Sequence, residues 1–206
     1  MFPDLFRDDV FTLETARLFL RWPKAKDVAT LCVEAGDRRV AESHAVIPHP
    51  YRPEDAVAFV SEARSQNLEG RGLYLAITAR KDQERLLGVA SLRQRPTGEV
   101  SLGYWLGVSH WGKGYATEAA QALLDAAFLY TNAPAIIAGV RVTNDRSRAV
   151  LERCGFQYVG SGMSQRPAWG DTVHTDEYRL SRRLWASLKG WRAPLPTERP
   201  EFRESA

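Results

Sequence analysis

The chain alternates apolar and polar residues in several short segments, which is the pattern of half-buried strands. Residues 16–21 are an example, because Leu18 and Leu20 fall on one face while Arg17 and Arg21 fall on the other. Residues 135–142 are apolar almost throughout, which is typical of an interior strand. The pattern predicts about seven strands, at residues 16–21, 73–78, 86–92, 100–108, 135–142, 157–160 and 172–180.

Apolar residues recur at helical spacing in other segments. These predict about four helices, at residues 25–35, 53–67, 117–130 and 146–153. Pro53, followed by Glu54 and Asp55, is a typical helix start. Short polar turns join the three strands between residues 73 and 108, so we expect these strands to form an antiparallel meander. The proline-containing segment 45–52 is predicted as a loop.

The order of these elements predicts a single mixed α+β domain. We place this domain at residues 13–185, after an N-terminal arm at 1–12 and before a basic C-terminal tail at 186–206. A chain of 206 residues, 44% hydrophobic and 26% charged, has the size and composition of one globular domain that can fold without stabilising disulfide bonds.

Several protein classes are excluded by composition. No apolar run approaches the roughly 18 residues of a membrane span, and the acidic N-terminus does not resemble a signal peptide. Two cysteines, Cys32 and Cys154, are too few for a zinc site, so no metal is expected and a reduced, cytoplasmic protein is predicted. The net charge is only +3, from 28 basic and 25 acidic residues, which argues against a nucleic-acid partner but suits an anionic cofactor.

A glycine-rich loop lies between the predicted strand 100–108 and the predicted helix 117–130. It reads Gly112-Lys113-Gly114-Tyr115-Ala116. Its glycines permit a tight turn, and the free N–H groups at the start of the helix suit a phosphate. Tyr115 after Gly114 excludes a nucleotide-binding Walker loop, and the antiparallel strands argue against a dinucleotide fold. A tight turn without a ligand is the alternative at this point.

Three longer segments extend this motif. They are Leu102-Gly103-Tyr104-Trp105-Leu106, the stretch from Trp111 to Ala119, and the stretch from Asn144 through Ser147 to Gly155-Phe156. In this order and spacing they resemble the GNAT family of N-acetyltransferases. They are most similar to the branch that includes the ribosomal-protein alanine/serine N-terminal acetyltransferases, which residues 14–21 also resemble. The resemblance spans about residues 13–182.

This resemblance implies a GNAT-like sheet splayed between strands 100–108 and 135–142, with acetyl-CoA as co-substrate in the splay. Trp111 stands where the family usually has Gln or Arg, which removes one polar phosphate contact. The implied function is direct acetyl transfer to a primary amine in a ternary complex, with a protein N-terminus as one acceptor. A small-molecule amine, or a catalytically weak acyl-CoA-binding domain, is the alternative. The implied cofactor-binding residues are Leu106, Val108, Gly112, Lys113, Gly114, Tyr115, Ala116, Asn144 and Ser147.

The family's usual acid for the leaving thiolate is a tyrosine, and this chain has Leu151 at that position. Ser147 matches the serine that contacts the cofactor sulfur in the ribosomal branch, so it is the predicted catalytic donor; a local helix role is the alternative. Asn144 is a predicted helix cap as well as a cofactor contact.

The general base and the acceptor site are less determined. Glu99 is the residue we assign as the base, with water chains as the alternative. The predicted substrate-binding residues are His44, Tyr104 and Trp105, although strand alternation lets only one of the last two face the cleft. Monomer and homodimer are equally compatible with the sequence. Other candidates for the base are His44, His49, Glu42, His110 and Asp176.

Overall fold

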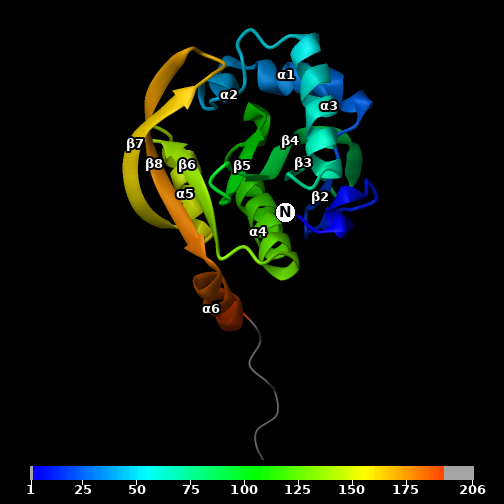
Figure 1. Cartoon of the computed structure of the whole chain (residues 1–206). Coiled ribbons are helices and arrows are strands. Elements are labelled where there is room, and N and C mark those ends of the chain that lie inside the picture. The colour runs from blue at the N-terminus through cyan, green and yellow to red at the C-terminus, as the bar shows by residue number, and fades with distance from the viewer. Residues whose placement is uncertain (1, 193–206) are drawn as a thin grey trace, which may run out of the picture.

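The computed structural model describes residues 2–192. Its central sheet has eight strands, in the order β1-β2-β3-β4-β5-β6-β8-β7 (Figure 1). The strands are β1 (Leu13–Glu14), β2 (Leu18–Arg21), β3 (Gly72–Ala79), β4 (Asp82–Gln94), β5 (Val100–Leu106), β6 (Ala135–Arg141), β7 (Gln157–Arg166) and β8 (Asp171–Ser181). The described helices are α1 (Val28–Gly36), α2 (Arg38–Glu42), α3 (Pro53–Leu68), α4 (Tyr115–Tyr130), α5 (Asp145–Arg153) and α6 (Arg182–Arg192).

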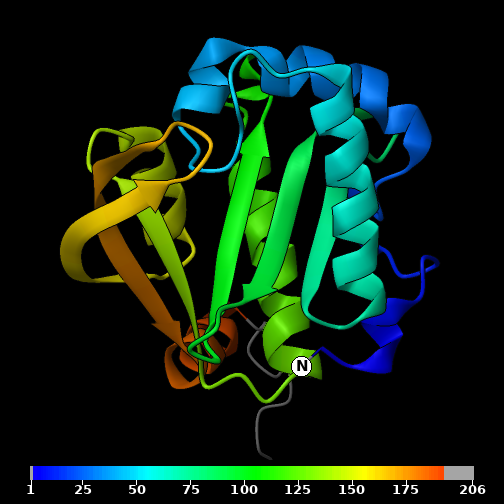
Figure 2. The same ribbon diagram turned by 45° about the horizontal axis from the view of Figure 1, so that its top comes forward.

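Strands β1 to β5 form the predicted antiparallel part of the sheet. Strands β5 and β6 run parallel but pair only at Val100↔Ile136 and Ser101↔Ile137. Beyond these two pairs the strands separate, whereas β6 stays paired with β8 along its whole length. The sheet is therefore splayed between β5 and β6, as predicted, and the splay widens toward the carboxyl ends of both strands (Figure 2).

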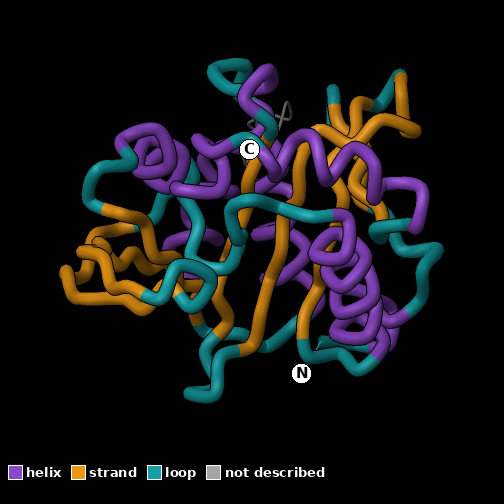
Figure 3. Tube along the Cα trace, turned by 90° about the horizontal axis from the view of Figure 1, so that it is seen from above, coloured by secondary structure: helices purple, strands orange, loops and turns teal. Residues whose placement is uncertain are grey.

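Strand alternation distributes the core over the two faces of the sheet. Leu75 of β3 and Leu123 of α4 belong to one buried cluster, which lies on the face covered by α4 and α5. Ala76 of β3 belongs to a second cluster with Leu31 of α1 and Val60 of α3. In Figure 2, α3 crosses one face of the sheet and α4 lies behind it. The hairpin β7–β8 lies on the opposite side of the molecule from α3 (Figures 1 and 3).

The structure confirms the α+β class and differs from the prediction in several elements. The short strand β1, the five-residue helix α2 and the helix α6 were not predicted. Strand β5 ends at Leu106, and Val108 begins a 3-10 helix, Val108–His110, so Val108 does not continue the strand. Strand β7 runs to Arg166, six residues beyond its predicted end at 160.

Both ends of the predicted domain extend further than expected. Phe2, Phe6 and Phe11 of the N-terminal arm are buried in the main core, so the described part of the arm packs as part of the domain. Helix α6 crosses the predicted boundary at residue 185. Residues 193–206 of the predicted tail lie outside the described residues. No helix within residues 2–192 has both the length and the apolar character of a membrane span.

Candidate active site

The glycine loop has the backbone shape that its sequence requires. Gly112 and Gly114 have φ angles of 74° and 79°, in the left-handed region that favours glycine. Gly114 is the N-cap of α4, and Tyr115 begins the helix. The first N–H groups of α4, which have no partner within the helix, are therefore presented at the end of this loop. The predicted loop geometry is confirmed, and Lys113 lies between the two glycines.

The open edge of β5 offers backbone groups to the splay. The N–H group of Gly107 bonds Leu87 of β4. Alternation along the strand then directs the N–H and C=O groups of Tyr104 and Leu106 away from β4, into the splay. Two side chains already use this edge: the Tyr104 carbonyl oxygen lies 3.0 Å from His44 Nε2, and the Leu106 carbonyl accepts a 2.7 Å bond from Trp111 Nε1. The backbone of Leu106 is thus directed into the splay, whereas Val108 lies beyond the end of the strand.

Trp111 occupies the motif position where the family usually has a polar residue. Its indole N–H bonds the Leu106 carbonyl, so its one polar atom points back to β5 rather than to the glycine loop. The Arg146 guanidinium of α5 lies 5.0 Å from the centre of the Trp111 ring. This cation–π contact joins the two sides of the splay at its open end. Sequence reasoning did not find Arg146, because nothing local links it to Trp111.

Ser147 lies in the first turn of α5, beside the splay. Its backbone N–H donates to Asn144 Oδ1 at 3.1 Å, so Asn144 is the predicted N-cap. The cap uses only the amide oxygen, which leaves the Asn144 amino group to donate elsewhere. The Tyr104 hydroxyl reaches across from β5, and its oxygen lies 2.9 Å from Ser147 Oγ. The structure therefore brings together Ser147 and Tyr104, which the sequence had placed in different roles.

Tyr104 and Trp105 face opposite sides of the sheet, as alternation requires. Tyr104 packs against the core cluster that contains Leu151 of α5. Trp105 packs on the other face, against the clusters of α1, α2 and α3. Burial raises the pKa of the Tyr104 phenol well above its ordinary value, so the hydroxyl stays protonated. Of the two, Trp105 is the one that lies beside the predicted acceptor loop, and Tyr104 faces Ser147.

The segment at the end of α2 and after it, residues 42–47, contacts both sides of the splay. His44 is tethered to β5, because its Nε2 lies within hydrogen-bond distance of the Tyr104 carbonyl oxygen. From the other side of the splay, Arg141 of β6 and Arg166 of β7 both donate to the Glu42 carbonyl. Trp169, in the β7–β8 turn, donates to the Ile47 carbonyl at 3.0 Å. These contacts close the loop onto the β7–β8 hairpin, and the sequence did not predict them.

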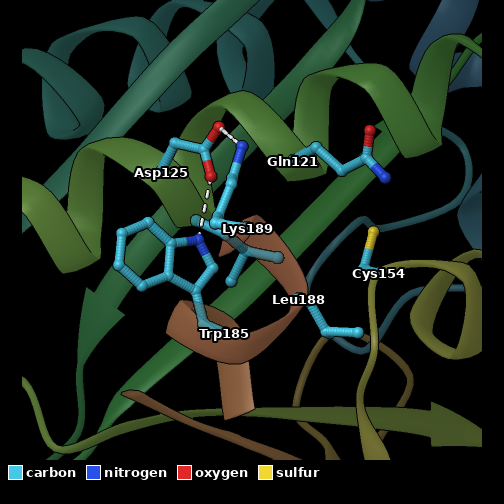
Figure 4. A pocket seen from close by; sticks show the side chains of 7 residues that line it. Gln121, Asp125, Cys154, Trp185, Leu188 and Lys189 are labelled. Carbon is cyan, nitrogen blue, oxygen red and sulfur yellow. Dashed lines mark hydrogen bonds and ion pairs between the residues drawn. The ribbon is translucent and has the colours of Figure 1, made fainter. Parts of the chain in front are cut away.

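A side-chain pocket beside α4 has lining residues that are separate from those of the splay. It lies between α4 and α6, where Asp125 accepts hydrogen bonds from Trp185 and Lys189 (Figure 4). Its other lining residues are Gln121, Leu124, Cys154 and Leu188. Neither the cofactor nor the acceptor prediction includes any of these residues.

A family profile for the acetyltransferase (GNAT) domain matches residues 17–157, which is more than half of the chain. The protein belongs to the GNAT acetyltransferase family. The match confirms the predicted family and enzyme class, an N-acetyltransferase that uses acetyl-CoA as co-substrate. It also fits the geometry, because the splay, the glycine loop and the capped start of α5 converge on one site.

Known relatives cover nearly the whole domain. The uncharacterized N-acetyltransferase p20 of Bacillus licheniformis is 29% identical over 179 residues, covering 85% of this chain and 98% of p20. Mycobacterium smegmatis RimJ, solved with a CoA disulfide, has a TM-score of 0.72 at 22% identity and covers 92% of this chain and 98% of its own. RimL, a ribosomal L7/L12 alpha-N-protein acetyltransferase solved with coenzyme A, has a TM-score of 0.71 at 21% identity. The match covers 83% of this chain and 98% of the RimL chain.

The structure does not bring Glu99, the predicted base, to this GNAT site. Glu99 precedes the closed end of the splay and forms an exposed ion pair with Arg179 at 3.5 Å. From Val100 to Tyr104 the strand extends about 13 Å, so Glu99 lies at the opposite end of β5 from Tyr104 and its contact with Ser147. The assignment of Glu99 is therefore withdrawn.

Three of the other base candidates, Asp176, His49 and His110, are engaged elsewhere. Asp176 lies on the α5 face, where it accepts a hydrogen bond from Ser161 and pairs with Arg148. His49 stacks on Trp169. His110 is nearly buried, with Nε2 3.8 Å from a carboxylate oxygen of Glu34, and burial lowers its pKa. Of the base candidates, His44 is the one that contacts Tyr104, through the Tyr104 carbonyl at the edge of the splay.

Proposed function

We propose that this protein transfers the acetyl group of acetyl-CoA to the α-amino group of a peptide or protein, by direct attack in a ternary complex. The observation that carries the proposal is the arrangement around the splay. The backbone edge of β5 at Leu106 faces the splay, α4 begins at Gly114 in the loop that follows β5, and the hydroxyl of Ser147 contacts Tyr104 of β5. A pantetheine arm would pair with the strand edge, and its pyrophosphate would meet the helix N-terminus.

In this scheme the amine attacks the thioester carbonyl, the new C–N bond forms, and the C–S bond breaks with its electron pair on sulfur. Ser147 is the predicted donor to the developing thiolate, since Leu151 supplies no phenol from α5. Hydrogen bonds that strengthen as charge develops act mainly in the transition state. In this scheme the ammonium proton passes to water, so no dedicated side-chain base is required.

A reaction that passes the proton to water favours an α-amino group over a lysine side chain. At pH 7.5 about a quarter of an α-amine with pKa near 8 is already unprotonated, against about one in a thousand of a lysine. The ribosomal-branch motifs point to the same acceptor class, and one of the solved structures with this fold is named as an alpha-N-protein acetyltransferase. A small amine of low pKa is the second candidate.

An amine panel tests the acceptor. Peptides that begin with Ser or Ala are compared with the same peptides blocked at the N-terminus but carrying an internal lysine, and with polyamines and amino acids. CoA-thiol release and the site of acetylation are measured for each. The proposal predicts acetylation of the free N-termini and little reaction with the blocked peptides. Reaction confined to small amines would reject the peptide acceptor, and binding of acetyl-CoA with no reaction would favour a binding domain.

A further inference from the structure

The Tyr104 hydroxyl spans the splay and ends on one residue. Its oxygen lies 2.9 Å from Ser147 Oγ and 3.1 Å from the Ser147 carbonyl oxygen. Its ring packs in the same cluster as Leu151, which is fully buried and stands where related enzymes place a tyrosine on this helix. A phenol is therefore present beside α5 after all, but it comes from β5.

Ser147 offers two acceptors to Tyr104, its Oγ and its carbonyl oxygen, so the Tyr104 hydroxyl can turn from one to the other without losing its hydrogen bond. In one arrangement Tyr104 donates to the Ser147 carbonyl, and Ser147 donates to the Tyr104 oxygen. In the other, Tyr104 donates to Ser147 Oγ, and the Ser147 hydrogen turns toward the splay. Each arrangement leaves Tyr104 with a partner, so turning the Ser147 hydrogen outward leaves no buried donor unsatisfied.

We propose that Tyr104 is a positioning residue that holds the Ser147 hydroxyl in the orientation that donates to the leaving sulfur. This inference rests on the proposed acetyl transfer. As the C–S bond breaks, Ser147 donates to the sulfur that receives the electron pair, and Tyr104 donates to Ser147 Oγ. Tyr104 keeps its proton throughout, and the proton released by the amine goes to water, so no further reactant is needed.

The environment of Tyr104 supports this role. Burial raises the pKa of its phenol, so the group is a donor and not a phenolate across the physiological range. When Tyr104 donates to Ser147 Oγ, the Ser147 hydroxyl becomes a stronger donor to the sulfur, because hydrogen bonds in a chain polarise one another. Position 104 is thus coupled to the reacting sulfur through Ser147, without touching the substrate.

Tyr104→Phe keeps the ring and removes only the hydroxyl. We expect kcat to fall about three- to tenfold, the loss typical of one neutral hydrogen bond, with little change in KM for acetyl-CoA. Tyr178→Phe is the matched control, because Tyr178 is also a buried tyrosine on the α5 face and makes no hydrogen bond to Ser147. A merely structural role would lower the unfolding temperature or raise KM instead of lowering kcat.

A double-mutant cycle separates action through Ser147 from independent action. If Tyr104 works through Ser147, then adding Tyr104→Phe to Ser147→Ala should reduce kcat by less than about twofold further. Losses that multiply in the double variant would overturn the proposal.

The second test needs no amine, so it is independent of the acceptor assignment. The thiol of CoA bound to the protein is titrated by its thiolate absorbance. The proposal predicts that the thiol pKa is lower in the wild-type complex than in free CoA, because hydrogen-bond donors favour the thiolate. In the Ser147→Ala and Tyr104→Phe complexes the thiol pKa should be higher than in the wild-type complex. An equal thiol pKa in the wild-type and Tyr104→Phe complexes would overturn it. Failure of CoA to bind the wild-type protein would instead reject the proposed function.

Discussion

Arg17 and Glu118 form an ion pair that fastens the start of the sheet to the glycine loop. Arg17 Nε lies 2.6 Å from Glu118 Oε2, and Arg17 Nη1 donates to the Lys113 carbonyl at 2.9 Å. Glu118 also accepts from the Thr15 hydroxyl at 2.6 Å and from the Arg17 backbone N–H at 2.9 Å. The Arg17 guanidinium lies 4.8 Å from the centre of the Tyr115 ring. The pair therefore fixes the carbonyl between the two glycines.

The first prediction follows from this clamp. Glu118→Ala should loosen the glycine loop, lower the stability by about 1–2 kcal/mol after allowance for exposure, and weaken CoA binding. Calorimetry with CoA and thermal unfolding measure both effects. Glu14→Ala is the control, because the side chains of the Glu14–Arg80 ion pair are both half exposed and the pair is not part of the clamp around Glu118. Unchanged CoA affinity in Glu118→Ala would show that the loop holds its shape without the clamp.

Gly114→Val should block acetyl-CoA binding. Gly114 has a φ of 79°, which a β-branched residue resists, and a Cβ there would lie 3.3 Å from Arg17 Nη2. Gly98→Val is a matched control, because Gly98 has a φ of 84° but lies in the turn before β5, at the closed end of the splay. Equilibrium binding of CoA is measured for both. CoA affinity equal to wild type in a folded Gly114→Val protein would remove the phosphate-binding role of the loop.

Ser147→Ala should lower kcat about ten- to a hundredfold and leave CoA affinity nearly unchanged, because a donor to thiolate works in the transition state. Steady-state kinetics and calorimetry give the two numbers. Ser61→Ala, on the exposed face of α3, is the control. If kcat stays within about twofold of wild type, Ser147 serves only the start of α5.

The rate should follow the protonation of the acceptor amine. Below the amine pKa, kcat/KM for an N-terminal peptide should rise about tenfold per pH unit and level off near pH 8, since only the free amine attacks. Rates are measured for two peptides whose α-amino pKa values differ. A pH midpoint near 6 to 7 that does not move with the amine would instead reveal a side-chain base.

Asp27→Ala should destabilise the protein by about 3–5 kcal/mol. Asp27 and Arg21 are buried and form two 2.8 Å hydrogen bonds, so the substitution leaves the guanidinium charge unpaired in the core. Glu84→Ala breaks the exposed Lys26–Glu84 pair and should leave the stability nearly unchanged. Urea unfolding compares the two. A loss below about 1 kcal/mol for Asp27→Ala would mean that water reaches Arg21.

The elements that position the site were largely predictable, because they depend on local patterns. The apolar run of β6 and the glycines before α4 specify their structures from a few consecutive residues. Helix α2 was missed because five residues carry no periodic signal. The boundary of β5 was set too late by two residues, since Val108 continues the apolar pattern while its backbone turns into a 3-10 helix.

The contacts that give the site its chemistry are long-range, and the sequence does not encode them visibly. Tyr104 and Ser147 are 43 positions apart, and Arg17 and Glu118 are 101 apart. Glu118 alone fits ordinary complementarity to the helix dipole, which hides its role as a clamp. Glu99 directly precedes β5 in sequence, but it lies at the end of β5 where the splay is closed. Spacing along the chain identified the loop, and only the fold identified its neighbours.

Release of the CoA thiol tests the central claim most directly. The protein is first loaded with acetyl-CoA, and a peptide with a free N-terminal Ser or Ala is then added while free thiol and acetylated peptide are measured together. The account predicts that the two appear in equal amounts, that neither appears without the peptide, and that Gly114→Val abolishes both. Acetyl-CoA that binds to the wild-type protein but releases no thiol with any amine would contradict it.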